Sequence, residues 1–286
     1  MTDHRVIADH RVIADHQRRH TGRGRSGPVR RAAREQPAIS LRDRFSPGSV
    51  LLGGHRGNPA EHPENTLVSF RSAIEIGVDV IECDVHLTTD RELAVIHDHT
   101  LERTTNGKGL VGKKTMTELE QLDAGNGEKI PRLEEVLELA RGRVGIAIEV
   151  KSLPVKYPGI EQVLVDKLRL EQMVDDSAVI SFDHRVVRET LEIEPELVGG
   201  VLVAGRPLLL PELLRYAHAQ VYSPHWSFVD TETVTEVHAA GAVLGVWTVD
   251  DVETLERCLR LGVDAIYTNR PGEIKAALAE RVTAPG

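Results

Sequence analysis

Short apolar runs alternate with helix-length segments from residue 48 to the end of the chain, and this alternation is the strongest constraint on the fold. The segments between the runs repeat their apolar residues with a period near 3.6, as amphipathic helices do. Strands that alternate with helices indicate a parallel sheet, and eight of them in about 240 residues fit a closed barrel. The sequence therefore predicts an α/β fold, a (β/α)₈ TIM barrel formed as a single domain by residues 47–286. The eight runs expected as strands are 49–54, 78–85, 93–98, 144–150, 177–182, 197–204, 219–224 and 242–249.

An open, doubly wound sheet is the competing architecture. Two features of the chain argue against it. The first strand is not followed by the glycine-rich dinucleotide fingerprint that such sheets carry, and ionisable residues stand at the ends of at least four expected strands. Sites assembled from several strand ends are typical of the barrel.

Residues 1–46 differ in composition from the rest of the chain. They begin with a direct repeat, DHRVIA at 3–8 and again at 9–14, and hold eleven arginines against five acidic residues. This segment thus carries +6, and because the whole chain carries -9, the remainder carries -15. We expect residues 1–46 to be a disordered basic tail. An arm that touches anionic lipid or RNA and an over-long reading frame are both open alternatives.

The charge and hydropathy of the body exclude some classes of partner. An acidic body argues against nucleic acid, since phosphate backbones are bound mostly through Lys and Arg. No stretch approaches the roughly 20 apolar residues of a membrane span, and the N-terminus has no apolar secretory segment, so we expect no stable membrane insertion. Two cysteines, Cys83 and Cys258, are too few for a disulfide framework. The predicted location is cytoplasmic, and the oligomeric state is left open.

The segment IECDVH, residues 81–86, places ionisable groups on one face of a strand. Alternate side chains share a face, so Glu82, Asp84 and His86 point one way while the apolar residues and Cys83 point the other. An exposed edge strand would explain the polar face but not the apolar flanks. Inside a barrel such groups are costly unless they are paired or bind metal. The pattern indicates a metal or catalytic site.

A second acidic strand end, IAIEVK at 146–151, has the same alternation. Glu149 falls on the face that can join Glu82 and Asp84, and Lys151 lies one step further along, where an anionic substrate would sit. A surface ion pair between Glu149 and Lys151 is the alternative. Three carboxylates without a thiolate form a hard oxygen site, which suits Mg²⁺ or Ca²⁺.

The connection between residues 84 and 93 is too short for a helical crossover. A tight turn at 88–91 instead predicts a hairpin in which residues whose numbers sum to about 179 face each other. This register sets His97 across from Glu82.

Residues 53–66, GGHRGNPAEHPENT, follow the first expected strand. His55 and Arg56 therefore belong at the same rim as the other strand ends. A histidine titrates near neutral pH, and an arginine can bind phosphate oxygens with two hydrogen bonds. Together they indicate phosphoryl chemistry.

An ordered set of motifs resembles the glycerophosphodiester phosphodiesterase family over about residues 50–275. The resemblance implies a (β/α)₈ barrel that uses a divalent cation to hydrolyse a small glycerophosphodiester to glycerol 3-phosphate and an alcohol. The chain between 97 and 131 has room for only a short excursion, so no large cap is expected. The motifs are HRG at 55–57, PENT at 63–66, the run 77–109, IPRLEEVL at 130–137, IEVK at 148–151, VWTVD at 246–250 and GVDAIYTNRP at 262–271.

The same resemblance implies roles for ten residues. We take His55 as the base and His97 as the acid, although the sequence does not fix their order. The other implied roles are metal binding by Glu82, Asp84 and Glu149, phosphate contacts by Arg56 and Lys151, orientation of groups at the rim by Glu64, and an organic pocket lined by Phe182 and Trp247.

Three rival functions remain open from sequence. A lysophospholipid substrate would require an apolar rim or a membrane-docking helix, and no amphipathic pattern in the sequence supplies one. A metal-dependent aldolase or isomerase could use the same barrel, since fold does not fix function. A catalytically silent binding barrel is the third, and His55 and His97 argue against it.

Overall fold

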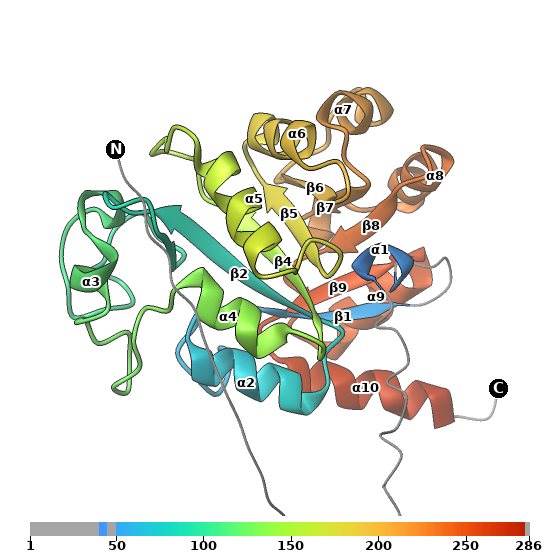
Figure 1. Cartoon of the computed structure of the whole chain (residues 1–286). Coiled ribbons are helices and arrows are strands. Elements are labelled where there is room, and N and C mark those ends of the chain that lie inside the picture. The colour runs from blue at the N-terminus through green and yellow to red at the C-terminus, as the bar shows by residue number, and fades with distance from the viewer. Residues whose placement is uncertain (1–39, 45–49, 284–286) are drawn as a thin grey trace, which may run out of the picture. The chain divides into compact units, whose positions relative to one another are not determined.

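The computed structural model describes residues 40–44 and 50–283. Eight parallel strands form a closed ring in the order β1, β2, β4, β5, β6, β7, β8, β9, and β1 pairs with both β2 and β9 to close it (Figure 1). The predicted (β/α)₈ barrel is confirmed. The barrel strands are β1 (Leu51–His55), β2 (Val80–Leu87), β4 (Gly145–Val150), β5 (Ser177–Ser181), β6 (Val198–Val203), β7 (Val221–Pro224), β8 (Val243–Val246) and β9 (Ala265–Thr268).

Helices follow most strands and pack outside the ring (Figure 1). Their ends carry local signals: Asp251 accepts a hydrogen bond from the Thr254 amide at the start of α9, and Gly262 ends this helix with φ 87°. The helices are α1 (Leu41–Arg44), α2 (Leu67–Ile76), α3 (Met116–Leu119), α4 (Leu133–Ala140), α5 (Ile160–Leu170), α6 (His184–Ile193), α7 (Leu210–Ala217), α8 (Thr231–Ala239), α9 (Val252–Leu261) and α10 (Pro271–Thr283), with 3₁₀ turns η1 (Val111–Lys113) and η2 (Trp226–Phe228).

One expected strand differs from the structure, and one barrel strand was not expected. The run 93–98 contributes only β3 (Leu93–Val95), which pairs antiparallel with β2 and lies outside the ring. The eighth barrel strand is β9, which the list of expected strands omitted. Its four residues form a short apolar run, and parallel partners on both sides, β1 and β8, hold it in the sheet.

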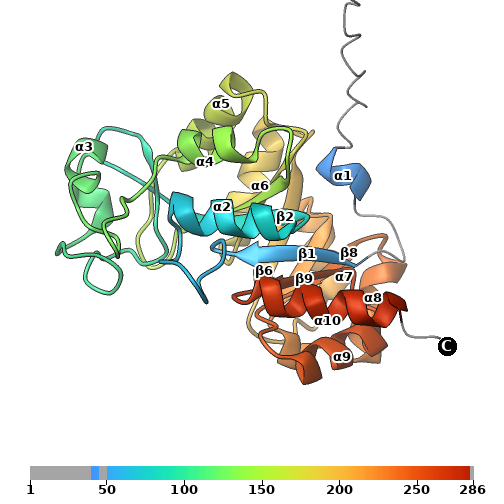
Figure 2. The ribbon, with the colours of Figure 1, turned by 90° about the horizontal axis from the view of Figure 1, so that it is seen from below.

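The excursion between β3 and α4 carries η1 and α3 and has a small apolar core of its own, which includes Leu101, Met116 and Leu119. It projects beyond the end of β2, away from the helices around the barrel (Figures 1 and 2). The expectation of a short excursion without a large cap agrees with this arrangement.

Most of the predicted tail, including the repeat, lies outside the described residues. Within it, however, α1 is ordered against the barrel. The Leu41 side chain is fully buried, and its amide donates to the Asp175 carbonyl at 2.8 Å. Leu41 fills the space above Gly145, where a Cβ would lie 2.7 Å from Leu41 Cδ1. Residues 40–44 of the expected tail thus contact the barrel, because the Leu41 side chain occupies the space that the missing side chain of Gly145 leaves.

Among the helices in the described ranges, none combines the length and apolarity needed to cross a bilayer.

Candidate active site

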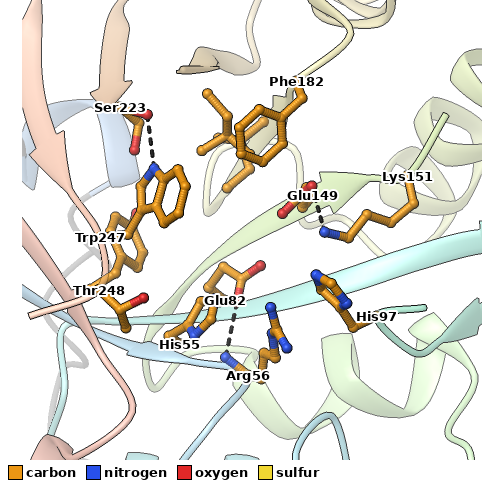
Figure 3. A pocket seen from close by; sticks show the side chains of 13 residues that line it. His55, Arg56, Glu82, His97, Glu149, Lys151, Phe182, Ser223, Trp247 and Thr248 are labelled. Atoms are coloured by element: carbon orange, nitrogen blue, oxygen red, sulfur yellow. Dashed lines mark hydrogen bonds and ion pairs between the residues drawn. The ribbon is translucent and has the colours of Figure 1, made fainter. Parts of the chain in front are cut away.

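A cavity of about 250 Å³ opens among residues that end or follow the barrel strands. Figure 3 shows its two unlike sides: charged groups from β1, β2 and β4 face the rings of Phe182 and Trp247. The lining residues are His55, Arg56, Glu82, His97, Glu149, Lys151, Ile180, Phe182, Leu202, Ser223, Trp247, Thr248 and Tyr267.

Glu82, Asp84 and Glu149 come together as the alternation of their strands predicts. One carboxylate oxygen from each lies within 4.8 Å of the others, and all three residues are buried. The register pairs Asp84 with Glu149 across β2 and β4, which explains the contact. Burial and the negative charges of its neighbours raise the pKa of Glu82 well above its usual value. Burial likewise raises the pKa of Glu149 to about 7, despite the opposing charge of Lys151.

Two cations and an amide hold Asp84 in the charged form. Lys151 Nζ lies 2.9 Å from its Oδ1, Arg56 Nε lies 3.3 Å from its Oδ2, and Asn65 Nδ2 donates to Oδ2 at 2.7 Å. Burial alone would raise the pKa of Asp84. The charges of Lys151 and Arg56 outweigh burial and keep this pKa well below its usual range.

Lys151 also lies 2.6 Å from Glu149 Oε1, so its ammonium group bridges two strand ends. Burial would lower the pKa of Lys151, but the carboxylates of Asp84 and Glu149 reverse the effect and raise it. Lys151 is therefore a permanent positive charge in the cavity wall.

Arg56 is fixed from several sides at the end of β1. Its amide donates to Glu82 Oε2 at 2.9 Å, and its Nη1 donates to Glu64 Oε1 at 3.0 Å. The residue adopts φ 55°, a left-handed conformation that is uncommon outside glycine. These contacts orient the guanidinium group toward the carboxylates and the cavity.

The carboxylate cluster fits a hard divalent cation. Glu82 Oε1 is buried and has no hydrogen-bond partner among the described residues, which is costly for a carboxylate oxygen unless a cation faces it. Three oxygen donors on adjacent strands, without a thiolate or imidazole in the group, match the preference of Mg²⁺ and Ca²⁺.

His55 ends β1 and lines the cavity. Its Nδ1 lies 2.7 Å from Asn269 Oδ1, in the segment that follows β9. Burial and the charge of Arg56 lower the pKa of His55 to about 4, so the ring is neutral at neutral pH.

His97 lies past the end of β3, and the predicted pairing with Glu82 is wrong. The last residues paired in the β2–β3 ladder are Val85 and Val95, the Ile96 amide donates once more to the Asp84 carbonyl at 3.0 Å, and His97 follows this last bond. His97 still reaches the cavity. The buried His86 helps to hold it, since His86 Nε2 lies 3.0 Å from the His97 carbonyl oxygen.

Glu64 lies behind Arg56 and is not among the described residues that line the cavity. Besides Arg56, it accepts two hydrogen bonds from Arg103, at 2.7 and 2.9 Å, and Arg103 comes from the excursion. Arg103 also donates to Asp98, which in turn contacts His97 Nδ1 at 2.6 Å. Glu64 is therefore linked to the cavity through Arg56, and to His97 through Arg103 and Asp98.

The aromatic side of the cavity has fixed rings. Phe182 and Trp247 meet edge to face with centroids 5.6 Å apart, and the indole Nε1 donates to the Ser223 carbonyl at 2.9 Å. The Tyr267 ring packs closely against Gly53, where an added Cβ would be 2.4 Å from the ring. Cys83, on the opposite face of β2, is fully buried in the outer core, as expected.

Five further residues, for which the sequence predicted no role, contact the site residues directly or through one another: Asn65, Asp98, Arg103, Asp250 and Asn269. Asn65 stands in PENT, Asp250 in VWTVD and Asn269 in TNRP, so their motifs were visible. These contacts join segments that lie far apart in the chain, and a local sequence pattern does not predict such contacts.

A model of the glycerophosphoryl diester phosphodiesterase family matches residues 55–273, which include the whole cavity lining. The chain belongs to this family. It is an enzyme family of phosphodiester hydrolases, and the buried carboxylate cluster described above is a suitable place for a divalent cation.

Members of the family with known names cover most of the chain. A glycerophosphodiester phosphodiesterase of Caldanaerobacter subterraneus subsp. tengcongensis is 38% identical over 230 residues, 78% of this chain and 95% of that protein. One from Bacillus altitudinis is also 38% identical, over 76% of this chain and 93% of that protein.

A solved structure extends the likeness to a ligand complex. The phosphodiesterase OLEI02445 of Oleispira antarctica, in complex with the product sn-glycerol-3-phosphate, superposes with a TM-score of 0.74 at 30% identity. The match covers 80% of this chain and 96% of that one.

Proposed function

We propose that this protein hydrolyses glycerophosphodiesters to glycerol 3-phosphate and an alcohol, with His55 as general base and His97 as general acid. One observation carries the proposal: two histidines line a single cavity together with two cations and with Glu82 and Glu149 of the carboxylate cluster. The product in the Oleispira antarctica structure supports the choice of substrate.

The two cationic side chains prepare the phosphate for attack. A phosphodiester is an anion and repels an oxygen nucleophile, so Arg56 and Lys151 would bind its free oxygens and offset their charge. A divalent cation held by Glu82, Asp84 and Glu149 would supply further positive charge at the phosphate. Mg²⁺ and Ca²⁺ are the proposed ions.

The two histidines would move the protons. His55 removes one from the attacking oxygen, which belongs to water or to the substrate's own glycerol hydroxyl; the latter route gives a cyclic phosphate first. His97 gives a proton to the leaving alkoxide as the bond to phosphorus breaks. Each such transfer typically contributes about 10²- to 10⁴-fold in rate.

The surroundings of the rings favour this order of roles. His55 faces a neutral amide oxygen of Asn269, whereas His97 faces the Asp98 carboxylate, which favours the protonated ring. His97 is also 31% exposed, so an alcohol leaving beside it would face solvent. Loose selectivity for the alcohol follows, while Phe182 and Trp247 would line the enclosed organic part of the site.

The experiment measures release of glycerol 3-phosphate from glycerophosphocholine and glycerophosphoethanolamine, with and without chelator. His55→Ala and His97→Ala should each lose most turnover, while His99→Ala, in the same segment as His97, retains it. A glycerophosphodiester of p-nitrophenol separates the two roles, because p-nitrophenolate leaves without a proton from a general acid. Turnover of this substrate should be restored in the His97 variant but not in the His55 variant. Wild-type rates in both variants would remove the proposed pair.

A lysophospholipid is a second candidate substrate, and the distribution of exposed apolar side chains supports this candidate. Six of the nine large hydrophobic side chains exposed in the described residues follow barrel strands at the open end. A double variant, Leu208→Ser with Leu209→Ser, tests this candidate. Its KM should rise for lysophosphatidylcholine and stay unchanged for glycerophosphocholine. These six are Leu153, Phe182, Leu208, Leu209, Phe228 and Val252.

The cytoplasmic location and the extent of the barrel domain, residues 47–286, stay as predictions from the sequence.

A further inference from the structure

A chain of hydrogen bonds leads from Asp250, after β8, to the ring of His55. Asp250 Oδ2 accepts from Asn269 Nδ2 at 2.7 Å, and its Oδ1 accepts from the Asn269 amide at 2.7 Å. Asn269 Oδ1 then lies 2.7 Å from His55 Nδ1. The segments that follow β8 and β9 thus converge on one imidazole at the end of β1.

The chemistry of these groups fixes the direction of every bond in the chain. An ionised carboxylate only accepts hydrogen bonds, so the NH₂ group of Asn269 has to face Asp250. The amide oxygen then has to face His55, and because a carbonyl oxygen also only accepts, the hydrogen lies on Nδ1. In the neutral ring Nε2 is consequently the unprotonated nitrogen, the one free to take a proton.

We propose that Asp250 and Asn269 are positioning residues that hold His55 as its Nδ1–H tautomer and thereby make Nε2 the proton acceptor. The inference rests on the proposed function for its effect on rate, but the tautomer itself does not depend on any substrate.

Fold stability alone does not account for the arrangement. Asp250 joins the β8 and β9 segments through the Asn269 amide and the Thr268 hydroxyl, at 2.7 and 3.0 Å, and these bonds need no amide side chain at 269. The Asn269 side chain serves one further contact, the one to His55. The second partner of the Asn269 side chain is Asp250, which prevents the amide group from rotating and exchanging the positions of its oxygen and nitrogen.

Asp250→Asn is the sharpest test, since it keeps the shape and removes one charge. The new NH₂ group at 250 would donate toward Asn269, whose amide would turn and present its own NH₂ group to His55 Nδ1. The ring should then take the Nε2–H tautomer, which cannot act as base at that nitrogen. In serine proteases the comparable change, an Asp→Asn that leaves the wrong histidine tautomer, costs about 10⁴-fold in kcat.

The measurement uses the full chain labelled with ¹⁵N in histidine, with the His55 signals assigned by their loss in His55→Ala. Ring ¹⁵N shifts distinguish the two tautomers directly. The wild type should show Nδ1–H, Asp250→Asn should show Nε2–H, and Asn269→Ala should show a mixture. We expect kcat for glycerophosphocholine to fall about 10²- to 10⁴-fold in Asp250→Asn, with KM within about threefold.

Asp251→Asn is the matched control. It makes the same change one residue along, where the side chain caps α9 and has no contact with Asn269. It should keep the wild-type tautomer and rate.

Two outcomes would overturn the proposal: a wild-type His55 with its hydrogen on Nε2, or an Asp250→Asn protein whose ring spectrum is unchanged, whatever its rate. If the wild type turns over no glycerophosphodiester, the proposed function fails, and the ring spectra still decide the tautomer.

Discussion

Asp98 Oδ1 lies 2.6 Å from Nδ1 of His97, its neighbour in sequence, so the loop after β3 carries an imidazole together with its own carboxylate partner. Arg103 donates to both oxygens of Asp98 and holds this carboxylate in place. The charge of Arg103 and its hydrogen bonds keep the pKa of Asp98 well below its usual value, so Asp98 stays ionised beside His97.

Asp98→Asn should weaken the acid. The Asp98 hydrogen bond raises the pKa of His97 against the lowering effect of burial, so its loss lowers this pKa further. A general acid works only when protonated, and the alkaline limb of the pH–rate profile should therefore move to lower pH. We expect kcat at pH 7.5 to fall roughly tenfold or more for glycerophosphocholine. Glu61→Gln, on an exposed loop, is the control; identical profiles for both variants would contradict the role of Asp98.

Glu149→Gln should weaken the cation site and leave the fold intact, because glutamine has the same size and can still accept from Lys151. Losing a direct ligand should raise the dissociation constant for Mg²⁺ or Ca²⁺ at least about tenfold, since even an outer partner of a metal ligand costs that much. Isothermal titration calorimetry on the wild type and on Glu149→Gln measures this dissociation constant. Glu138→Gln, on the exposed side of α4, is the control and should bind the cation as the wild type does. Equal affinities in all three proteins would place the cation elsewhere.

Cation affinity should fall as pH drops below about 7. Burial raises the pKa of Glu149 to about 7, so in the cation-free protein a proton competes for this carboxylate at and below that pH. The neighbouring Glu82, whose pKa is also raised by burial, acts in the same direction. The apparent association constant should decrease by up to about tenfold for each pH unit below 7 for each proton displaced. Titrations at pH 6, 7 and 8 in buffers of different ionisation enthalpy count the protons released; an affinity independent of pH would show that neither carboxylate binds the ion.

Leu41→Ala should destabilise the barrel although residue 41 precedes the first strand. Its side chain is fully buried against Gly145, so truncation leaves a cavity and should cost about 2–4 kcal/mol of the free energy of unfolding. Leu170→Ala, which removes the same atoms from a side chain that is 73% exposed, should change it by less than about 0.5 kcal/mol. Urea unfolding followed by circular dichroism compares them, and equal midpoints would mean that α1 does not dock in solution.

Local periodicity was enough to predict the parts of this protein that depend on one strand at a time. The period of two puts Glu82 and Asp84 on one face of β2 and Glu149 on the matching face of β4, and parallel pairing then brings them together. The alternation of strands and helices likewise predicted the barrel. The carboxylate cluster and the barrel both depend on regular strand and helix geometry, which the pattern of apolar residues predicts directly.

Features set by pairing between distant segments were not predictable in this way. The position of His97 depends on where the β2–β3 pairing stops: the Val95 amide donates to the Pro131 carbonyl on the other side of β3, and the Ile96 amide makes the last bond to β2, at Asp84. The contact between Asn269 and His55 depends on loops after β1 and β9. The six exposed apolar side chains come from segments after five different strands, which only the closed barrel brings to one end.

His55 and its partner Asn269 are separated by 214 positions and meet because the first and last strands pair. A ribosome making this chain exposes the histidine 214 residues before the asparagine. A nascent or prematurely terminated polypeptide that lacks β9 therefore lacks the Asn269 contact to this imidazole, so hydrolytic competence would arise only after β9 has closed the ring.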